Sequence, residues 1–208
     1  MSSSSPDSPG LLVQSLRFAD SGPYSFALGP GSCTGLDGVS GVGKTRLLRA
    51  LADIDQSTGR VVLNGKDREH YTPPQWRRLV ALVPAESRWW HPTVAEHLPG
   101  DHDQRQAVEL LQGCGFEPDI LGWDVSRLST GEKQRLSLVR ALIRTPQILL
   151  LDEAGSGLDR DNGELLEGLV SNFLADRGAA AIWVSHDPRQ LERVATLTMT
   201  MFKDRLSF

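Results

Sequence analysis

The chain has 208 residues, of which 39% are hydrophobic, so it can bury one substantial core with at most a small attached subdomain. A net charge of -4 and a pI near 5.7 argue against a general attraction to nucleic acid or anionic membranes, and no nucleic-acid partner is expected. The longest apolar runs, such as 148–151, are far too short to span a membrane. Residues 1–10 lack the basic start and apolar centre of a secretion signal, so they are predicted to form a disordered tail ahead of a folded region at 11–208.

Strand and helix patterns alternate along the folded region. Short strands are predicted at 11–18, 24–28 and 32–36, and at 60–63, where the following Asn64-Gly65 indicates a hairpin. Apolar runs without alternation predict strands covered on both faces at 80–83, 148–151 and 180–184. Crossover helices are expected at 45–53, 162–177 and 188–195. This order predicts an α/β fold with a helix-rich insertion at about 86–144.

The segment LSTGEKQRLSLVRAL at 128–142 begins with a capping box, in which the Ser129 hydroxyl caps the first amides and Glu132 reaches back. The apolar face of the predicted helix is formed by Leu136, Val139, Leu142 and Ile143. The basic side chains expected largely off that face are Lys133, Arg135, Arg140 and Arg144. The helix should stop at Thr145-Pro146. Ser-Thr-Gly-Glu either only starts a helix or also presents amides to a group outside the subunit.

The strongest chemical signal is GVSGVGKT at 38–45, a full G-x-x-x-x-G-K-T match directly after a predicted strand. Glycines let the backbone wrap closely around phosphates at a helix N-terminus, which argues against a simple Gly-rich turn. Lys44 is expected to reach the β- and γ-phosphates of a nucleotide, and Thr45 to ligate magnesium. The predicted nucleotide-binding residues of this segment are Gly38, Ser40, Gly41, Val42, Gly43, Lys44, Thr45 and Arg46.

A second signal is QILLLDE at 147–153, where a predicted buried strand ends in two adjacent carboxylates. The ends of parallel strands are where ligands bind in open α/β folds, so both acids are expected beside the phosphate loop. Asp152 is predicted to hold magnesium through water, and Glu153 to orient or deprotonate the attacking water.

The ordered motifs GVSGVGKT, LSTGEKQR, ILLLDE, GSGLD and VSHD resemble the ATP-binding cassette family from residue 11 to the C-terminus. The resemblance implies a P-loop NTPase fold with a RecA-like, mostly parallel sheet, a small antiparallel β subdomain and an inserted helical subdomain. It also implies that two cassettes pair head to tail, with Ser129, Gly131 and Glu132 of one contacting ATP held by the other. In the same way, Asp159 belongs to a loop that joins the two sites, and His186 acts at the γ-phosphate beside Lys44 and Glu153.

The sequence departs from the family pattern at several positions. Thr130 and Glu132 replace the usual glycine and glutamine of the signature. In LVPAESRWWHPTV, at 82–94, Ala85 stands where a glutamine is expected, so either Glu86 supplies an oxygen to magnesium or the site relies on water. The aromatic residue that stacks on adenine is not evident. Phe18 and Tyr24 are the candidates, and plain core packing is the alternative for each.

These features predict an ATP- and Mg²⁺-dependent ATPase subunit of an ABC transporter, working as a dimer and energising a separate integral membrane permease. The subunit would be cytoplasmic, held at the inner face of the membrane by that permease. Adjacent Trp89 and Trp90 cannot easily both enter one small core, so they are the candidate docking anchor; the alternative is that both fold over the helical insertion. Two other functions fit part of the sequence. The first is a soluble cassette ATPase that serves DNA repair, chromosome or translation work. The second is a simple P-loop kinase, but a kinase function leaves LSTGE, GSGLD and VSHD without a role.

Overall fold

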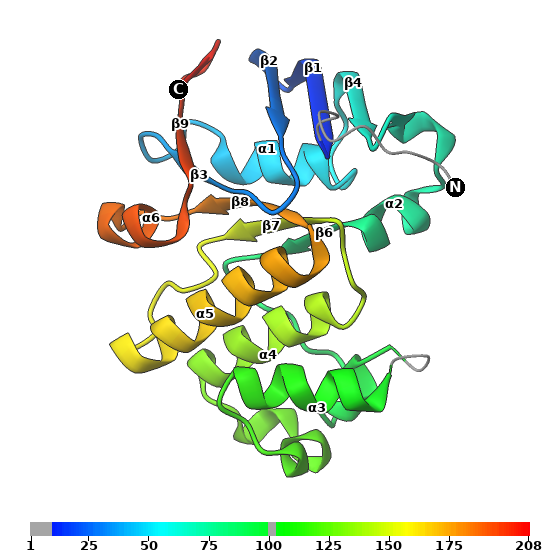
Figure 1. Ribbon diagram of the computed structural model, residues 1–208, viewed down its shortest axis with the longest axis vertical. Coiled ribbons are helices and arrows are strands. Elements are labelled where there is room, and N and C mark those ends of the chain that lie inside the picture. The colour runs from blue at the N-terminus through cyan, green and yellow to red at the C-terminus, as the bar shows by residue number, and fades with distance from the viewer. Residues whose placement is uncertain (1–9, 100–102) are drawn as a thin grey trace.

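The computed structural model describes residues 10–99 and 103–208, whose strands form two sheets (Figure 1). The tail expected at 1–10 therefore lies outside the described residues, apart from Gly10. The smaller sheet is antiparallel, with the order β2-β1-β4-β5. Its strands are β1 Leu11–Phe18, β2 Ser21–Leu28, β4 Thr58–Leu63 and β5 Lys66–Asp67. Asn64 and Gly65 join β4 to β5 with φ angles of 48° and 80°, which confirms the hairpin prediction.

The larger sheet has the order β10-β9-β3-β8-β7-β6, and all its pairings are parallel except that of β10 with β9. Its strands are β3 Cys33–Asp37, β6 Val80–Val83, β7 Ile148–Asp152, β8 Ala180–Val184, β9 Leu197–Met201 and β10 Leu206–Ser207. The carboxyl ends of β3, β7 and β8 therefore meet at one edge, where the motif residues follow them.

Both faces of this sheet are covered by apolar side chains. Ile148 and Leu150 of β7 point into one hydrophobic core, whereas Leu149 and Leu151 point into a second core on the opposite face. The same alternation occurs in β8, where Trp183 belongs to the second core. Runs without polar residues were predicted to be strands buried on both sides, and this arrangement confirms it.

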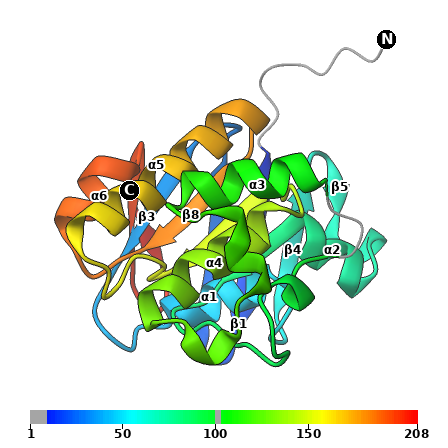
Figure 2. The same cartoon turned by 90° about the horizontal axis from the view of Figure 1, so that it is seen from below.

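Helices form the covering layers (Figures 1 and 2). Helix α1, Lys44–Leu51, lies between the two sheets and contacts β1, β6 and β7. On the other face, α5, Arg160–Arg177, and α4, Thr130–Leu142, pack with α3, Gln104–Gly113. Helix α6, Pro188–Val194, contacts β3, and α2, Pro73–Leu79, precedes β6. Within the described part of 86–144 the strand signal is limited to one isolated bridge, between Thr93 and Asp124.

Helix α4 differs from its prediction on its polar side. All residues from 134 to 139 are buried, and Arg135 is only 8% exposed although it was expected off the apolar face. Its guanidinium donates to the carbonyl oxygen of Cys114 and lies 4.4 Å from the centre of the Phe116 ring. The reason is that α4 is packed between β6 and α3, so an arginine that stacks on an aromatic ring can remain inside. The helix also ends at Leu142, ahead of Thr145-Pro146.

Candidate active site

The loop at 38–43 connects β3 to α1 in a tight turn of the kind that the sequence predicts. Gly38 and Gly43 have φ angles of 146° and 115°, which residues with a side chain rarely adopt. A Cβ atom at Gly38 would also lie 2.8 Å from the carbonyl oxygen of Met201, so larger residues are excluded there. Around Gly41 a Cβ atom would meet open space, so this part of the loop is free to approach a ligand.

Lys44 and Thr45 occupy the first turn of α1 and connect the loop to β7. The Lys44 side chain is buried, and its Nζ donates to the carbonyl oxygens of Gly38, at 2.6 Å, and Val39, at 3.4 Å. These two contacts hold the ammonium group against the loop at the N-terminus of α1. A helix N-terminus and a cation both favour an anion, so this position is suited to binding one. Thr45 Oγ1 donates to Asp152 Oδ1 at 3.1 Å.

Asp152 is 5% exposed, and burial raises the pKa of its carboxyl group, while Thr45 and Lys44 act in the opposite direction. A cation beside Asp152 and Thr45 would compensate the burial of this carboxylate. Hydroxyl and carboxylate oxygens are the ligands that Mg²⁺ prefers, so these two residues fit that ion directly or through water.

Glu153 and His186 form a pair at the carboxyl ends of β7 and β8. Glu153 Oε1 lies 2.7 Å from His186 Nε2, and the side chains are 23% and 55% exposed. The backbone of Glu153 has a positive φ of 53°, and its N–H donates to the carbonyl oxygen of Val184 at 3.0 Å. This carboxylate is largely shielded from solvent, is held by an imidazole and lies next to a phosphate loop. It can therefore orient a water molecule or accept a proton from it.

Most of these groups line a cavity of about 770 Å³, a size typical of small-molecule sites, whereas Gly38 and Asp152 are not among its lining residues. Its lining includes the predicted residues Ser40, Gly41, Val42, Gly43, Lys44, Thr45, Arg46, Glu153 and His186. Asp20, Ser21 and Lys203 also line it, and sequence reasoning missed all three because they belong to no motif. The loop amides, Lys44 and the Thr45–Asp152 pair fit a nucleoside triphosphate with its metal ion.

Neither aromatic candidate for adenine stacking lines this cavity. Tyr24 is fully buried, and its hydroxyl donates to the carbonyl oxygens of Phe202 and Lys203. Phe18 is 4% exposed, and its ring centre lies 5.6 Å from that of Tyr24. Both rings are thus engaged in packing beneath the loop, which favours the core-packing alternative.

Glu86 is exposed and does not line the phosphate cavity. Next to it, the carbonyl oxygen of Pro84 accepts a hydrogen bond of 3.0 Å from Gln134 of α4, which holds the segment where glutamine is replaced by Ala85. The metal role of Glu86 stays a prediction. If it acts at the metal, Glu86→Ala should shift the magnesium dependence of ATPase turnover to higher concentration by severalfold; a magnesium titration of turnover that matches the unsubstituted protein removes Glu86 from this role.

The signature residues lie at the start of α4, away from the residues that line the phosphate cavity. Ser129 Oγ accepts from the Glu132 N–H at 3.2 Å, and Glu132 Oε2 accepts from the Ser129 N–H at 2.8 Å, which confirms the capping box. The Ser129 N–H and hydroxyl both donate to Glu132 Oε2, and these two hydrogen bonds lower the pKa of Glu132, so it stays a carboxylate at neutral pH. Gly131 contacts the neighbouring loop, since a Cβ atom there would lie 3.1 Å from Leu158 Cδ2.

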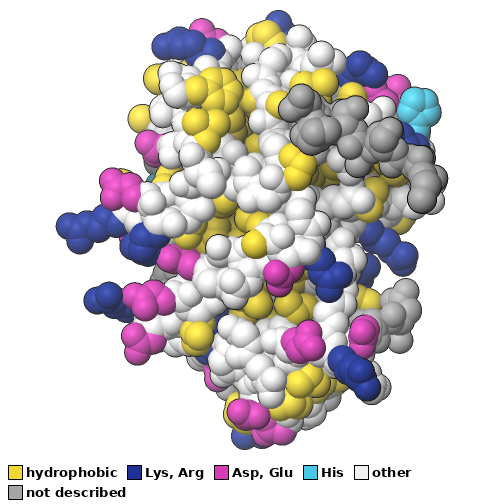
Figure 3. Space-filling model, viewed as in Figure 1, with side chains coloured by type: hydrophobic (Ala, Val, Ile, Leu, Met, Phe, Trp, Pro, Cys, Tyr) yellow, Lys and Arg dark blue, Asp and Glu magenta, His cyan; other side chains and the backbone are white. Residues whose placement is uncertain are grey.

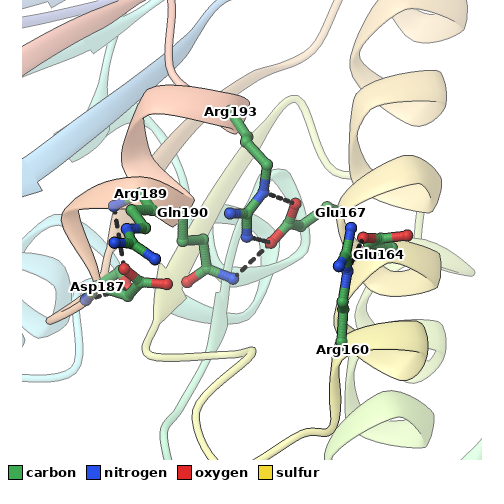
Figure 4. A network of polar contacts seen from close by, with 8 residues as sticks. Arg160, Glu164, Glu167, Asp187, Arg189, Gln190 and Arg193 are labelled. Carbon is green, nitrogen blue, oxygen red and sulfur yellow. Dashed lines mark hydrogen bonds and ion pairs between the residues drawn. The ribbon is translucent and has the colours of Figure 1, made fainter.

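A second cavity, of about 700 Å³, adjoins the first and shares Glu153 and His186 with it. Asp159 lines it and caps α5, accepting from the N–H of Asn162 at 2.9 Å. Figure 4 shows the polar contacts of its wall: Glu167 of α5 accepts from Gln190 and from Arg193, both on α6. This network braces α6, which directly follows the His186 segment.

The sequence of the chain is similar to those of proteins from one family. A sequence model of the family described as ABC transporter matches residues 22–156. The chain is 30% identical over 184 residues to "Probable iron export ATP-binding protein FetA" of Escherichia coli (strain K12), a match that covers 83% of this chain and 82% of that one. It is 34% identical over 182 residues to "Aliphatic sulfonates import ATP-binding protein SsuB 2" of Paracoccus denitrificans (strain Pd 1222), which covers 85% and 69%.

Among solved structures, the fold is similar to that of a bacterial Atm1-family ABC exporter with ATP bound, with a TM-score of 0.85 at 22% identity. That match covers 98% of this chain and 39% of the exporter chain. The fold is also similar to cbiO1 from Clostridium perfringens, part of the ABC transporter complex cbiONQ, with a TM-score of 0.81 at 20% identity and coverage of 96% and 87%. The matched fold is the P-loop NTPase architecture that the motifs predict. With its phosphate loop, paired carboxylates and similarity to these subunits, the chain belongs to the ABC transporter family as one of its ATP-binding, ATP-hydrolysing subunits.

Proposed function

We propose that the 770 Å³ cavity binds ATP with Mg²⁺ and that the chain uses the bound nucleotide in the following way. The amides of the loop 38–43 and Lys44 hold the phosphates. Thr45 and Asp152 hold the metal ion, which neutralises phosphate charge when bound. Glu153 orients the attacking water and takes its proton, and His186 keeps the Glu153 carboxylate in place across their 2.7 Å contact.

Two copies of the chain share these sites. The observation that supports this most directly is the separation of Ser129, Gly131 and Glu132 from the phosphate cavity of their own copy. The start of α4 is exposed at Ser129 and Thr130, and a helix N-terminus favours an anion. In a head-to-tail pair this end of one copy closes over the γ-phosphate held by the other, and Asp159 joins the two sites. Closure is then coupled to nucleotide binding.

A separate membrane permease docks beside Trp90. None of the described helices is both long and apolar enough to cross a membrane. A cavity of about 270 Å³ lies between α4 and the end of α1, lined by Ile54, Leu82, Trp90 and Arg140, among others. Trp90 is 66% exposed, whereas Trp89 packs against the hydrophobic core and donates its Nε1–H to Ser87. Exposed tryptophans beside a pocket are typical anchors for a partner.

The ATPase would thus lie on the cytoplasmic side, peripheral to the inner face of the membrane. This role is favoured over a soluble cassette ATPase that acts on nucleic acid. The similar proteins are named as iron export and sulfonate import ATP-binding proteins, and acidic and basic side chains are mixed on the face seen in Figure 3.

Replacement of Trp90 tests the docking role. Trp90→Ala should leave the basal ATPase turnover of the isolated subunit nearly intact but reduce copurification of a membrane permease from detergent extracts by about tenfold or more, as loss of an anchor residue does. Phe208→Ala is the matched control, because Phe208 is 67% exposed and does not line this cavity. Equal permease recovery with Trp90→Ala, or capture of only soluble nucleic-acid proteins by both forms, would contradict the docking role.

A further inference from the structure

His97 is a buried histidine directly beneath the segment that carries Trp90. It ends the short 3-10 turn Ala95–His97 and is 5% exposed. Its Nε2 atom lies 2.8 Å from the backbone nitrogen of Trp90 and 3.0 Å from that of His91. Its Nδ1 atom lies 2.9 Å from the carbonyl oxygen of Thr93. One imidazole ring therefore holds both ends of the turn at 90–93.

These contacts require one protonation state of His97. A backbone N–H can only donate and a carbonyl oxygen can only accept, so Nδ1 must carry the hydrogen and Nε2 must present its lone pair to both amides. A second proton on Nε2 would remove this lone pair and place an N–H group against two others. The turn as folded here is therefore compatible only with neutral His97.

The surroundings of His97 act in the same direction. Its ring centre lies 4.7 Å from that of Trp89 and 4.9 Å from that of Trp90, and Arg140 of α4 lies over both tryptophans. Burial, followed by Arg140 and His91, lowers the pKa of His97, while the hydrogen bond to Thr93 and the charge of Glu96 oppose this. The other charged side chains that line the same cavity, Arg77 and Arg144, are also cationic.

We propose that His97 is a positioning residue of the docking surface: in its neutral form it holds Trp90 at the rim of the 270 Å³ cavity, and its protonation releases Trp90 and weakens docking of the membrane partner. The link to the partner rests on the proposed function, whereas the holding of Trp90 does not.

The sign of the pH effect follows from the direction of the pKa shift. Because the pKa of folded His97 lies below its ordinary value of 6.5, the unfolded chain takes up the proton first as the pH falls. The stabilisation by neutral His97 is complete above pH 6.5 and is lost as the pH falls through and below it. The turn should therefore be ordered at neutral pH and loosened in mild acid.

Amide hydrogen exchange of the isolated full chain tests this, since the two amides bonded to His97 report the contact directly. Between pH 7.5 and 5.5, their protection relative to intrinsic exchange should fall by up to about tenfold, the limit that uptake of one proton at the ordinary pKa of 6.5 sets over this range. Ring ¹⁵N shifts should show the Nδ1–H tautomer at pH 7.5.

Two variants separate this role from plain packing. His97→Gln places an acceptor oxygen near the Nε2 position without a titratable proton, so its protection should be the same at both pH values. His91→Gln removes the exposed neighbouring histidine and should keep the loss seen in the unsubstituted protein. Protection that does not change with pH in the unsubstituted chain, or that falls equally in His97→Gln, would overturn the proposal.

A second arm adds the partner. Copurified permease should fall by up to about tenfold between pH 7.5 and 5.5 with the unsubstituted chain and stay constant with His97→Gln. If no permease is recovered at any pH, the proposed function fails while the exchange result stands. If permease recovery is equal at both pH values although exchange changes, the link between His97 and docking is wrong.

Discussion

Glu153→Gln is expected to lower ATP turnover by about a hundredfold or more while ATP binding persists. Glutamine has nearly the same shape and still reaches His186, but it carries no charge and is a very weak base. The phosphate loop, Lys44 and the Thr45–Asp152 contact do not involve the Glu153 side chain, so nucleotide affinity should change little. Steady-state phosphate release measures turnover, and equilibrium titration with ATP measures affinity.

Glu164→Gln is the matched control for this change. Glu164 is an exposed carboxylate of α5 that pairs with Arg160 at 2.9 Å, a surface ion pair of small energetic weight. It should turn over ATP at the rate of the unsubstituted protein. If Glu153→Gln also does so, Glu153 neither orients water nor accepts its proton, and the catalytic group lies elsewhere in the cavity.

The buried strands were predictable because they are apolar on both faces. β6, β7 and β8 match the expected segments to within one residue. The elements that were not predicted include α2 and β9. α2 has seven residues and begins with two prolines, and only Trp76 is buried, so it shows no helical period. β9 has the sequence LTMTM, whose apolar and polar residues alternate as in a half-buried strand, so the local sequence carries a strand signal that the prediction did not include. Its place in the sheet is set by pairing with β3.

Some residues of the candidate site are placed by local sequence, and others are brought there only by tertiary folding. Lys44, Thr45, Asp152 and Glu153 were predictable because a strand end or helix start places them next to their motif neighbours. Lys203 lines the same cavity from the segment after β9, and only tertiary folding brings it there. The burial of Arg135 was missed for the same reason, because its partners Cys114 and Phe116 lie outside the helix that carries it.

The tryptophan pair shows where local reasoning reaches its limit. Two adjacent side chains at a turn were expected not to enter the core together, and Trp89 and Trp90 do differ in burial. Which of them points inward depends on His97 and Arg140, which lie seven and fifty residues beyond Trp90 in the sequence. For this reason the docking test uses Trp90→Ala alone, since removal of Trp89 would also disturb the core.

The shared-site arrangement predicts that two inactive variants restore each other. Ser129→Arg places a bulky cation at the start of α4 and should abolish activity, as should Lys44→Ala, which removes the phosphate-binding ammonium. In a dimer of one copy each, the intact loop of the Ser129→Arg copy faces the intact signature of the Lys44→Ala copy. One complete site forms, and the other carries both defects.

The most direct measurement is the ATPase turnover of such heterodimers, isolated through a different affinity tag on each copy. The shared-site account predicts a rate well above that of either variant alone, at most about half that of the unsubstituted dimer, since one of two sites is intact. Heterodimers that are no more active than the two variants measured separately would contradict it, and Ser129 would then serve only the helix that it caps.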